Sequence, residues 1–163
     1  MFKKYIIVFL ISMIPLIELR GAVPVGLSSA FGDVLPIIPL YIVCIIGNML
    51  PVPIIFFFAR KVLEWGANKK FIGKFFTFCL EKGEKGGKKL QEKAGRGLYF
   101  ALFLFVGIPL PGTGAWTGTL AASLLDMDFK KSIVAVMAGV VLAGIIMGLA
   151  SAGVFGAIGA IFS

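Results

Sequence analysis

Three long hydrophobic runs without a charged residue dominate this chain of 163 residues: 34–59, 98–125 and 132–163. Each run exceeds the roughly 20 residues that a helix needs to cross the core of a bilayer. Hydrophobic residues make up 59% of the chain, and its mean hydropathy is +1.01. We therefore expect one domain, residues 1–163, of the all-α integral membrane class that crosses the membrane more than once.

The polar segment 60–97 predicts the orientation of the chain. It carries eleven Lys or Arg residues against four acidic ones, so the positive-inside rule makes it a cytoplasmic loop. Phe and Lys residues are interspersed over 59–80, which is typical of an interfacial amphipathic helix. The glycine-rich part 81–97 predicts a flexible linker. A basic aromatic segment beside membrane spans is expected to contact membrane lipids, and we expect no nucleic acid as a partner.

The chain shows the same order of segments twice, before and after the basic loop. An interrupted hydrophobic stretch (5–32) precedes the span 34–59, and a second interrupted stretch (98–125) precedes the span 132–163. The first stretch contains Gly21, Pro24 and Gly26, and the second contains two prolines and four glycines within 107–118. This pattern predicts an inverted repeat of two units, each an interrupted helical hairpin followed by a transmembrane helix.

The prolines predict where backbone carbonyls lack a helical partner. Pro24 would leave the carbonyl of Arg20 free, and Pro109 and Pro111 would free those of Phe105 and Gly107. In hydrocarbon such backbone persists only where it faces protein or a wet cavity. A straight 28-residue helix would be about 42 Å long against a core of about 30 Å, whereas a hairpin could reach the midplane and return. We therefore favour re-entrant hairpins, with four broken transmembrane helices as the alternative.

Re-entry fixes a topology. Hairpin one enters from outside, 34–59 crosses inward, hairpin two enters from the cytoplasm, and 132–163 crosses outward. This places Lys130 and Lys131 inside, as the positive-inside rule requires, but leaves Lys3 and Lys4 outside. The model with four helices reverses that balance, so charge alone does not decide between the two.

Glu18 and Arg20 are two charges in an otherwise apolar stretch. An ionisable side chain costs about 2.5 to 3.5 kcal/mol at the centre of a membrane helix, so this pair is a candidate functional site. Residues two apart on a helix do not face each other, which means that either the backbone is irregular there or each charge has a partner elsewhere. A desolvated Glu18 beside Arg20 suits a proton-coupled cycle. The alternative is a mutually satisfied pair that locks the fold.

The expected binding site lies where the two hairpins meet near the midplane. Candidate partners of the charges are the carbonyls of Phe105 and Gly107 together with Thr113, Thr117 and the indole N–H of Trp116. Half-helices that begin after Gly21 and Gly112 would direct their positive ends at the cavity. Asn48, near Pro51 and Pro53, either lines this cavity or marks a kink. The complete predicted set is Glu18, Arg20, Gly21, Pro24, Asn48, Pro109, Pro111, Gly112, Thr113, Gly114, Trp116 and Thr117.

Several residue types argue against catalysis. Histidine is absent, and Cys44 and Cys79 have neither disulfide nor metal spacing, so both are interpreted as packing residues. No nucleophile–base pair stands out. We expect no enzyme activity, no metal and no cofactor. Small residues at four-residue spacing in the last span predict close helix packing, within the fold or in a homodimer: Gly144, Gly148, Ala152, Gly156 and Ala160.

Two motifs carry a resemblance to a known family. Glu18-Leu-Arg-Gly-Ala-Val-Pro-Val-Gly26, with Pro109-Leu-Pro-Gly-Thr-Gly-Ala-Trp-Thr-Gly118, resembles the prokaryotic small multi-drug export protein family over nearly the whole chain. The paired hairpins are more remotely similar to the DedA superfamily, whose members are implicated in moving phosphorylated polyprenyl carriers. DedA proteins typically have arginines around the second proline motif, whereas 98–125 carries no charge here.

The resemblance implies a small exporter in a prokaryotic cell membrane that moves amphiphilic or drug-like substrates, with proton coupling through Glu18 as an option. Within transport, the alternative is a polyprenyl-phosphate or phospholipid translocase of DedA type. From another class, the alternative is a membrane assembly protein that does not transport, whose basic loop recruits lipids or partners.

Overall fold

A computed structural model describes residues 1–29, 31–69, 73–74, 77–78, 81, 95–110 and 112–162, and at 63 and 154–162 it describes the backbone alone. Within these residues the regular structure is helical throughout, as the sequence predicts. The predicted amphipathic helix at 59–80 and the linker at 81–97 lie largely outside the described residues. Helix α4 nevertheless extends to Ala67, eight residues beyond the hydrophobic run that ends at Ala59.

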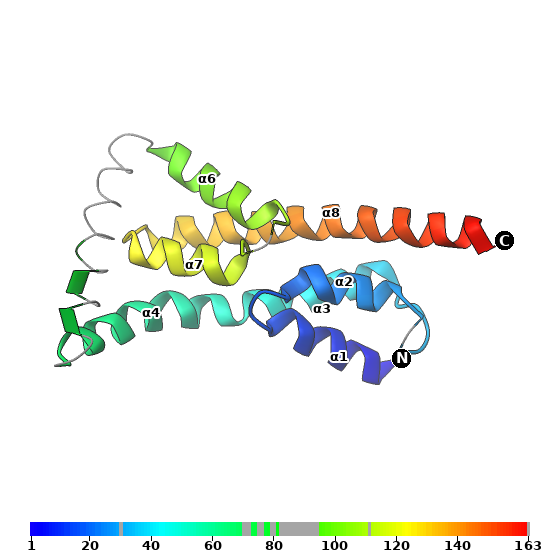
Figure 1. The fold of residues 1–163 in the computed structure, drawn as a ribbon, viewed down its shortest axis with the longest axis horizontal. Helices are drawn as coiled ribbons and strands as arrows, with labels where there is room; N and C mark the ends of the chain where they lie inside the picture. The colour runs from blue at the N-terminus through cyan, green and yellow to red at the C-terminus, as the bar shows by residue number, and fades with distance from the viewer. Residues whose placement is uncertain are drawn as a thin grey trace.

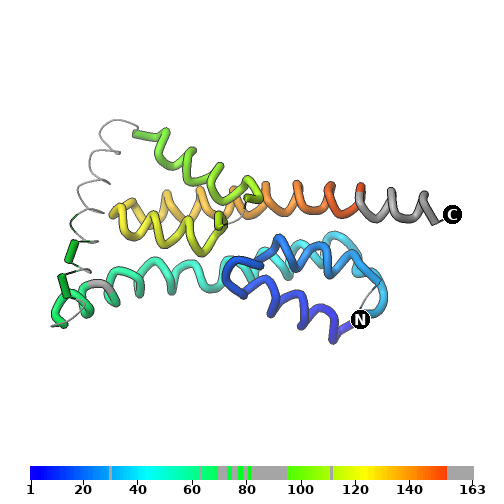
Figure 2. Tube along the Cα trace, in the orientation of Figure 1, coloured from blue at the N-terminus to red at the C-terminus, as the bar shows by residue number. Residues whose placement is uncertain are grey.

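Each half of the chain contains a pair of short helices followed by a long helical stretch (Figures 1 and 2). In the first half, α1 (Phe2–Met13) and α2 (Glu18–Leu27) precede α3 (Ile37–Met49) and α4 (Pro51–Ala67). In the second half, α6 (Arg96–Gly107) and α7 (Ala115–Leu124) precede α8 (Phe129–Phe162). We call α1 and α2 the first helix pair, and α6 and α7 the second.

Only the long stretches reach the length of a membrane span among the described residues. Ile37–Ala67 covers 31 residues and contains an 18-residue window with a mean hydropathy of 2.3, and Phe129–Gly153 covers 25 residues and contains an 18-residue window with a mean hydropathy of 2.7. The two pairs instead consist of a 12-residue and a 10-residue helix each. At 1.5 Å per residue these are about 18 Å and 15 Å long, roughly half of a bilayer core.

The two helix pairs approach each other from opposite ends of the molecule. In Figure 1, the turn between α1 and α2 and the turn between α6 and α7 both lie near the middle. Helices α1 and α2 extend from there toward the right of the view, and α6 and α7 toward the left, while α3, α4 and α8 run alongside. The turns of the two pairs are thereby brought to the same level of the bundle.

The first helix pair turns earlier in the sequence than expected. Helix α1 ends at Met13, because Pro15 favours an extended backbone at the residue before it, and Ile14 has φ −71° and ψ 129°. The chain then reverses through Leu16, which has φ 71°, and enters α2 at Glu18, which has φ 54°. The prediction that the interruption lies around Gly21, Pro24 and Gly26 is wrong, because all three lie within α2.

The two glycines of α2 have a packing role instead. A Cβ on Gly21 would lie 2.4 Å from Cγ2 of Ile17, and a Cβ on Gly26 would lie 2.3 Å from Cδ1 of Leu40. Glycine therefore allows α2 to pack tightly against the preceding turn and against α3. Pro24 fits inside the helix, since its missing N–H removes one bond in a segment that is otherwise held by its neighbours.

Lys4 is buried, with 2% of its surface exposed, although the sequence places it beside a chain end. Its ε-ammonium donates to the carbonyl oxygens of Ser28, Gly32 (3.4 Å) and Asp33 (2.8 Å), which lie in the loop after α2. Lys4 therefore ties the start of α1 to the loop after α2, whereas Lys3 of the same helix is exposed.

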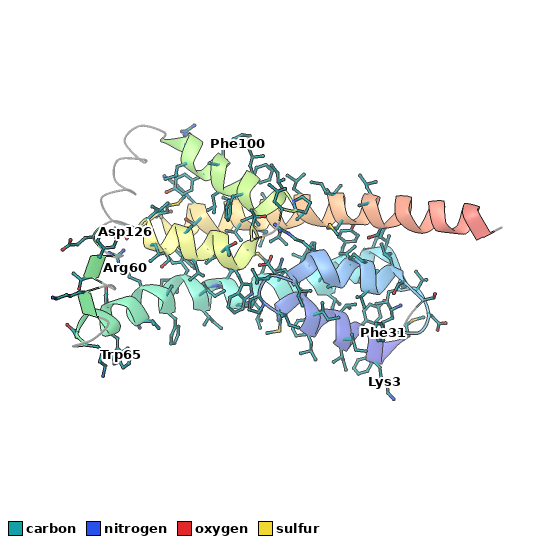
Figure 3. The ribbon with its side chains drawn as sticks, in the orientation of Figure 1. Lys3, Phe31, Arg60, Trp65, Phe100 and Asp126 are labelled. Carbon is teal, nitrogen blue, oxygen red and sulfur yellow. The ribbon has the colours of Figure 1, made fainter. Side chains whose placement is uncertain are left out.

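Polar contacts also close the opposite end of the bundle, where α4 lies against α7 (Figure 3). Arg60 of α4 forms an ion pair with Asp126 after α7, and the Ser123 hydroxyl donates to the carbonyl of Phe56 at 2.6 Å. In Figure 3, Arg60 and Asp126 lie at the end of the molecule away from Lys3 and Phe31. Helices from both halves of the chain are thus joined near this end.

The small-residue stripe of α8 is used, in its first part, inside the fold. The Tyr41 hydroxyl of α3 donates to the carbonyl of Gly144 at 2.6 Å, and a Cβ on Gly148 would lie 1.9 Å from that hydroxyl. The close approach of Tyr41 therefore depends on glycine at position 148, and at Gly144 a Cβ would lie 3.0 Å from the tyrosine ring, a tight contact. The homodimer stays a prediction.

Candidate functional site

Glu18 of α2 caps the first turn of α7. Its carboxylate accepts hydrogen bonds from the backbone N–H of Ala115 at 3.0 Å and of Trp116 at 2.9 Å, and only 3% of the residue is exposed. The first N–H groups of a helix have no partner within the helix and form its positive end. A buried carboxylate from the first half of the chain thus satisfies donors in the second half.

Glycine at position 114 makes this approach possible. Gly114 has φ 145°, a conformation that side chains rarely adopt, and a Cβ there would lie 2.7 Å from Oε2 and 2.8 Å from Oε1 of Glu18. Both the backbone conformation and the space for the carboxylate therefore depend on glycine. The sequence indicated Gly114 as part of a break, but not this contact.

Arg20 lies two residues after Glu18 in α2 and binds the other side of the second break, between α6 and α7. Its guanidinium donates to the carbonyl oxygens of Leu110 at 2.8 Å, Val106 at 3.0 Å and Ile108 at 3.3 Å. These carbonyls belong to the end of α6 and the turn after it, where a helix has unpaired acceptors and its negative end. The prediction that Phe105 and Gly107 supply the carbonyls is wrong by one residue in each case.

Glu18 and Arg20 therefore hold the two helix ends that flank the second break. Glu18 binds the start of α7 and Arg20 binds the end of α6, so each charge meets the helix end of opposite sign. The irregular backbone at Glu18, with φ 54°, lets the two side chains diverge toward these ends. Of the two explanations offered by the sequence, the structure shows both an irregular backbone and separate partners.

The threonines of the second break bond locally. The Thr113 hydroxyl lies 3.0 Å from the carbonyl oxygen of Ile108 and 2.8 Å from that of Leu110, the same acceptors that Arg20 uses. The Thr117 hydroxyl lies 3.4 Å from the carbonyl oxygen of Gly114. Gly112 turns the chain with φ 79°, and Pro109 lies between two of the carbonyls that Arg20 binds. Pro111 lies outside the described residues.

Four predicted site residues contribute differently from expectation. Trp116 offers Glu18 its backbone N–H, whereas its indole N–H is buried and has no hydrogen-bond partner in the described part of the chain. Gly21 and Pro24 lie inside α2 and do not form the break that the sequence predicted. Asn48, which is 2% exposed in α3, has a buried Oδ1 atom that likewise meets no donor among the described residues.

Glu18 and Arg20 form their hydrogen bonds with backbone groups of the second break. A cavity of about 810 Å³ lies between α6 and α8, and neither Glu18 nor Arg20 lines it. Among the described residues no cluster of three His, Cys, Asp or Glu side chains could hold a metal ion. The residues that the sequence analysis missed are Lys4, whose burial gives no local signal, and the cations beside the cavity, which were considered only for topology.

A scan against protein-family models supports the predicted family. Residues 18–146, which are most of the chain, match the family described as "Putative small multi-drug export protein". Comparison with curated proteins gave no match, and neither did comparison with solved structures. The matched region begins at Glu18, just after the turn between α1 and α2, and it includes Arg20 and the whole break between α6 and α7 that these two side chains contact. The chain therefore belongs to the small multi-drug export protein family.

Proposed function

We propose that this protein exports amphiphilic or drug-like molecules across the cell membrane and that the joint formed by Glu18 and Arg20 opens and closes during transport. The observation that carries this proposal is the contact of one short segment, Glu18 to Arg20, with both helix ends of the second break. A transporter needs two halves that move against each other around a site near the midplane. The joint lies where the two helix pairs meet.

The lengths of the helices support re-entry and an inverted repeat within this proposal. Both pairs combine a 12-residue helix with a 10-residue helix, and each is followed by a stretch long enough to span a bilayer. The pairs point toward each other from opposite ends in Figure 1. Two such pairs would enter the membrane from opposite sides, with the basic segment 60–97 in the cytoplasm.

We include proton coupling in this proposal because of the chemistry of the joint. The carboxylate of Glu18 accepts two backbone N–H bonds, and bonds to an ionised acceptor are roughly twice as strong as neutral ones. Protonation of Glu18 would weaken these bonds and release the start of α7. Access of protons to Glu18 from one side of the membrane would then bias the joint toward its open form.

The contacts of Arg20 favour export over translocation of a polyprenyl phosphate. The guanidinium already donates to three backbone carbonyls through Nη1 and Nη2, and the second break carries no arginine that could bind a phosphate in its place. A DedA-type lipid translocase would need such a cation to be available. The alternative of an assembly protein rests on the basic loop, most of which lies outside the described residues.

Transport of a lipophilic cation by purified protein in liposomes tests the proposal. Ethidium flux under an imposed pH gradient should be measured for the wild type, Glu18→Gln and Arg20→Ala, with Glu64→Gln as the matched control. We expect the wild type and Glu64→Gln to show flux that depends on pH, and Glu18→Gln to lose that dependence. Absence of flux in the wild type, or unchanged flux in both Glu18→Gln and Arg20→Ala, would contradict the proposal.

Cysteine labelling tests the topology separately. Lys130→Cys, placed in a Cys44→Ala and Cys79→Ser background, should react with an impermeant maleimide from the cytoplasmic side only. Lys3→Cys in the same background should react from outside. Labelling of position 130 from outside would contradict the re-entrant arrangement.

A further inference from the structure

The cavity of about 810 Å³ lies between the first halves of α6 and α8. Both helices begin at this end, and they run in the same direction in Figure 1. The cavity lies away from the joint, so its chemistry is independent of Glu18 and Arg20. Its lining residues are Gly95, Arg96, Tyr99, Phe103, Lys130, Lys131, Val134, Ala135 and Ala138.

Three cations surround one end of the cavity. Arg96 belongs to α6, whereas Lys130 and Lys131 belong to the first turn of α8. Within the described residues, no carboxylate lies within 4.0 Å of the charged groups of Arg96 or Lys130. The carboxylate of Asp128 is engaged as an N-terminal cap, since it accepts a hydrogen bond from the N–H of Lys131 at 3.1 Å. The cluster therefore keeps an excess of positive charge.

The start of α6 strengthens this potential. It lies at the same end of the cavity as the cations, and no side chain caps it. Its first N–H groups place partial positive charge beside the three cations, whereas Asp128 caps the start of α8. Tyr99 adds a hydroxyl, which accepts a hydrogen bond from the N–H of Asp128 at 3.2 Å, and the ammonium of Lys131 lies 5.7 Å from the centre of its ring.

The rest of the cavity is apolar. Phe103 of α6 lines it opposite Val134, Ala135 and Ala138 of α8, and these residues lie about one to two turns further along their helices than the cations. The alanines leave the space that a larger side chain would fill. The two ends of the cavity thus differ in the same way as the head group and the chain of a lipid.

We propose that this cavity binds one anionic phospholipid of the surrounding bilayer. The phosphate would lie at Arg96, Lys130 and Lys131, and an acyl chain would lie along Phe103 and Ala138. Basic pockets between membrane helices are known to bind anionic head groups on the cytoplasmic side. The site does not depend on the export proposal, and bound lipid would hold α6 against α8.

Native mass spectrometry of the full chain released from detergent micelles tests this site. We expect one phosphatidylglycerol to stay bound, and neither phosphatidylcholine nor glycerol 1-phosphate to bind comparably. The triple variant Arg96→Gln, Lys130→Gln and Lys131→Gln should weaken phosphatidylglycerol binding by at least about tenfold, because each cation near a membrane surface contributes roughly a fivefold effect. Lys3→Gln with Lys61→Gln and Lys69→Gln removes the same charge elsewhere and should change binding less than twofold.

A change of shape tests the apolar end while the charges stay intact. Ala138→Phe should occupy the space for the chain and weaken phosphatidylglycerol binding by at least about fivefold, whereas Ala152→Phe on the exposed part of the same helix should not. Equal retention of phosphatidylcholine would overturn the proposal, as would equal losses in the two triple variants. Glycerol 1-phosphate binding as tightly as phosphatidylglycerol would also overturn it, because the site would then take free anions.

Discussion

The carboxylate of Glu18 accepts a hydrogen bond from the backbone N–H of Trp116 at 2.9 Å, across 98 positions of the chain. This bond holds the start of α7 against a residue of α2. The first N–H groups of a helix have no partner within the helix, and this carboxylate supplies one. Arg20 does the same for carbonyls at the end of α6, where the last acceptors lack a partner within the helix.

Replacing Glu18 by Gln should destabilise the fold. Glutamine keeps one acceptor oxygen but places an amide N–H against one of the two backbone donors, which leaves that donor unsatisfied. We expect a loss of about 1–3 kcal/mol in the free energy of unfolding, measured in mixed micelles with increasing SDS. Glu64→Gln should have an effect near zero, because Glu64 is exposed and its ion pair with Arg60 is 3.5 Å long.

Gly114→Ala should destabilise more than Gly112→Ala. Both glycines have positive φ, 145° and 79°, but only at Gly114 would a Cβ lie within 3 Å of the Glu18 carboxylate. Strain of the backbone alone costs about 1–3 kcal/mol. The difference between the two variants in the same unfolding assay measures the clash with Glu18. Equal losses would show that the carboxylate does not lie against Gly114.

Lys4→Met should destabilise the first helix pair, while Lys3→Met should not. Methionine keeps most of the aliphatic length of lysine but leaves the carbonyls of Ser28 and Asp33 without their donor. We expect a loss of about 1–3 kcal/mol for Lys4→Met. Faster proteolysis in the loop after α2 would provide a second readout. A similar loss for Lys3→Met would contradict the burial of Lys4.

Gly148→Ala should be destabilising in a way that Tyr41→Phe partly reverses. The added Cβ would lie 1.9 Å from the Tyr41 hydroxyl, and phenylalanine lacks that oxygen. Tyr41→Phe alone loses the bond to the Gly144 carbonyl, which is worth about 0.6 kcal/mol in membrane helices. A double-mutant cycle should therefore give a favourable interaction energy between the two substitutions. Additive effects would show that α8 does not pack on Tyr41 as described.

Much of the fold could be predicted from local sequence signals. Uncharged runs predicted the two long spans, and proline and glycine predicted that the second hydrophobic stretch breaks after Gly107. The first break was misplaced because glycine and proline at 21 to 26 look like a turn, whereas α2 accommodates them by packing on Leu40 and Ile17. Pro15, with its effect on Ile14, was the signal that marks the actual turn.

The candidate site could be predicted only as a pair of residues. A charge in an apolar stretch stands out because it is costly to place in a membrane, so the sequence indicated Glu18 and Arg20. Their partners were not, because the acceptors and donors are backbone groups that every residue carries. Arg20 binds the carbonyls of Val106, Ile108 and Leu110, and not those of their neighbours, because of how α2 packs against the second half of the chain.

The sequence by itself determined the class of this protein, its long hydrophobic spans and the two charges that require partners, because hydropathy and insertion cost depend on local composition. Only the tertiary structure decided that Glu18 and Arg20 bind opposite helix ends of one break, that Lys4 is buried, and that Arg96 and Lys130 lie beside one cavity. These relationships join residues far apart in the chain. They depend on the packing of whole helices, which no local pattern encodes.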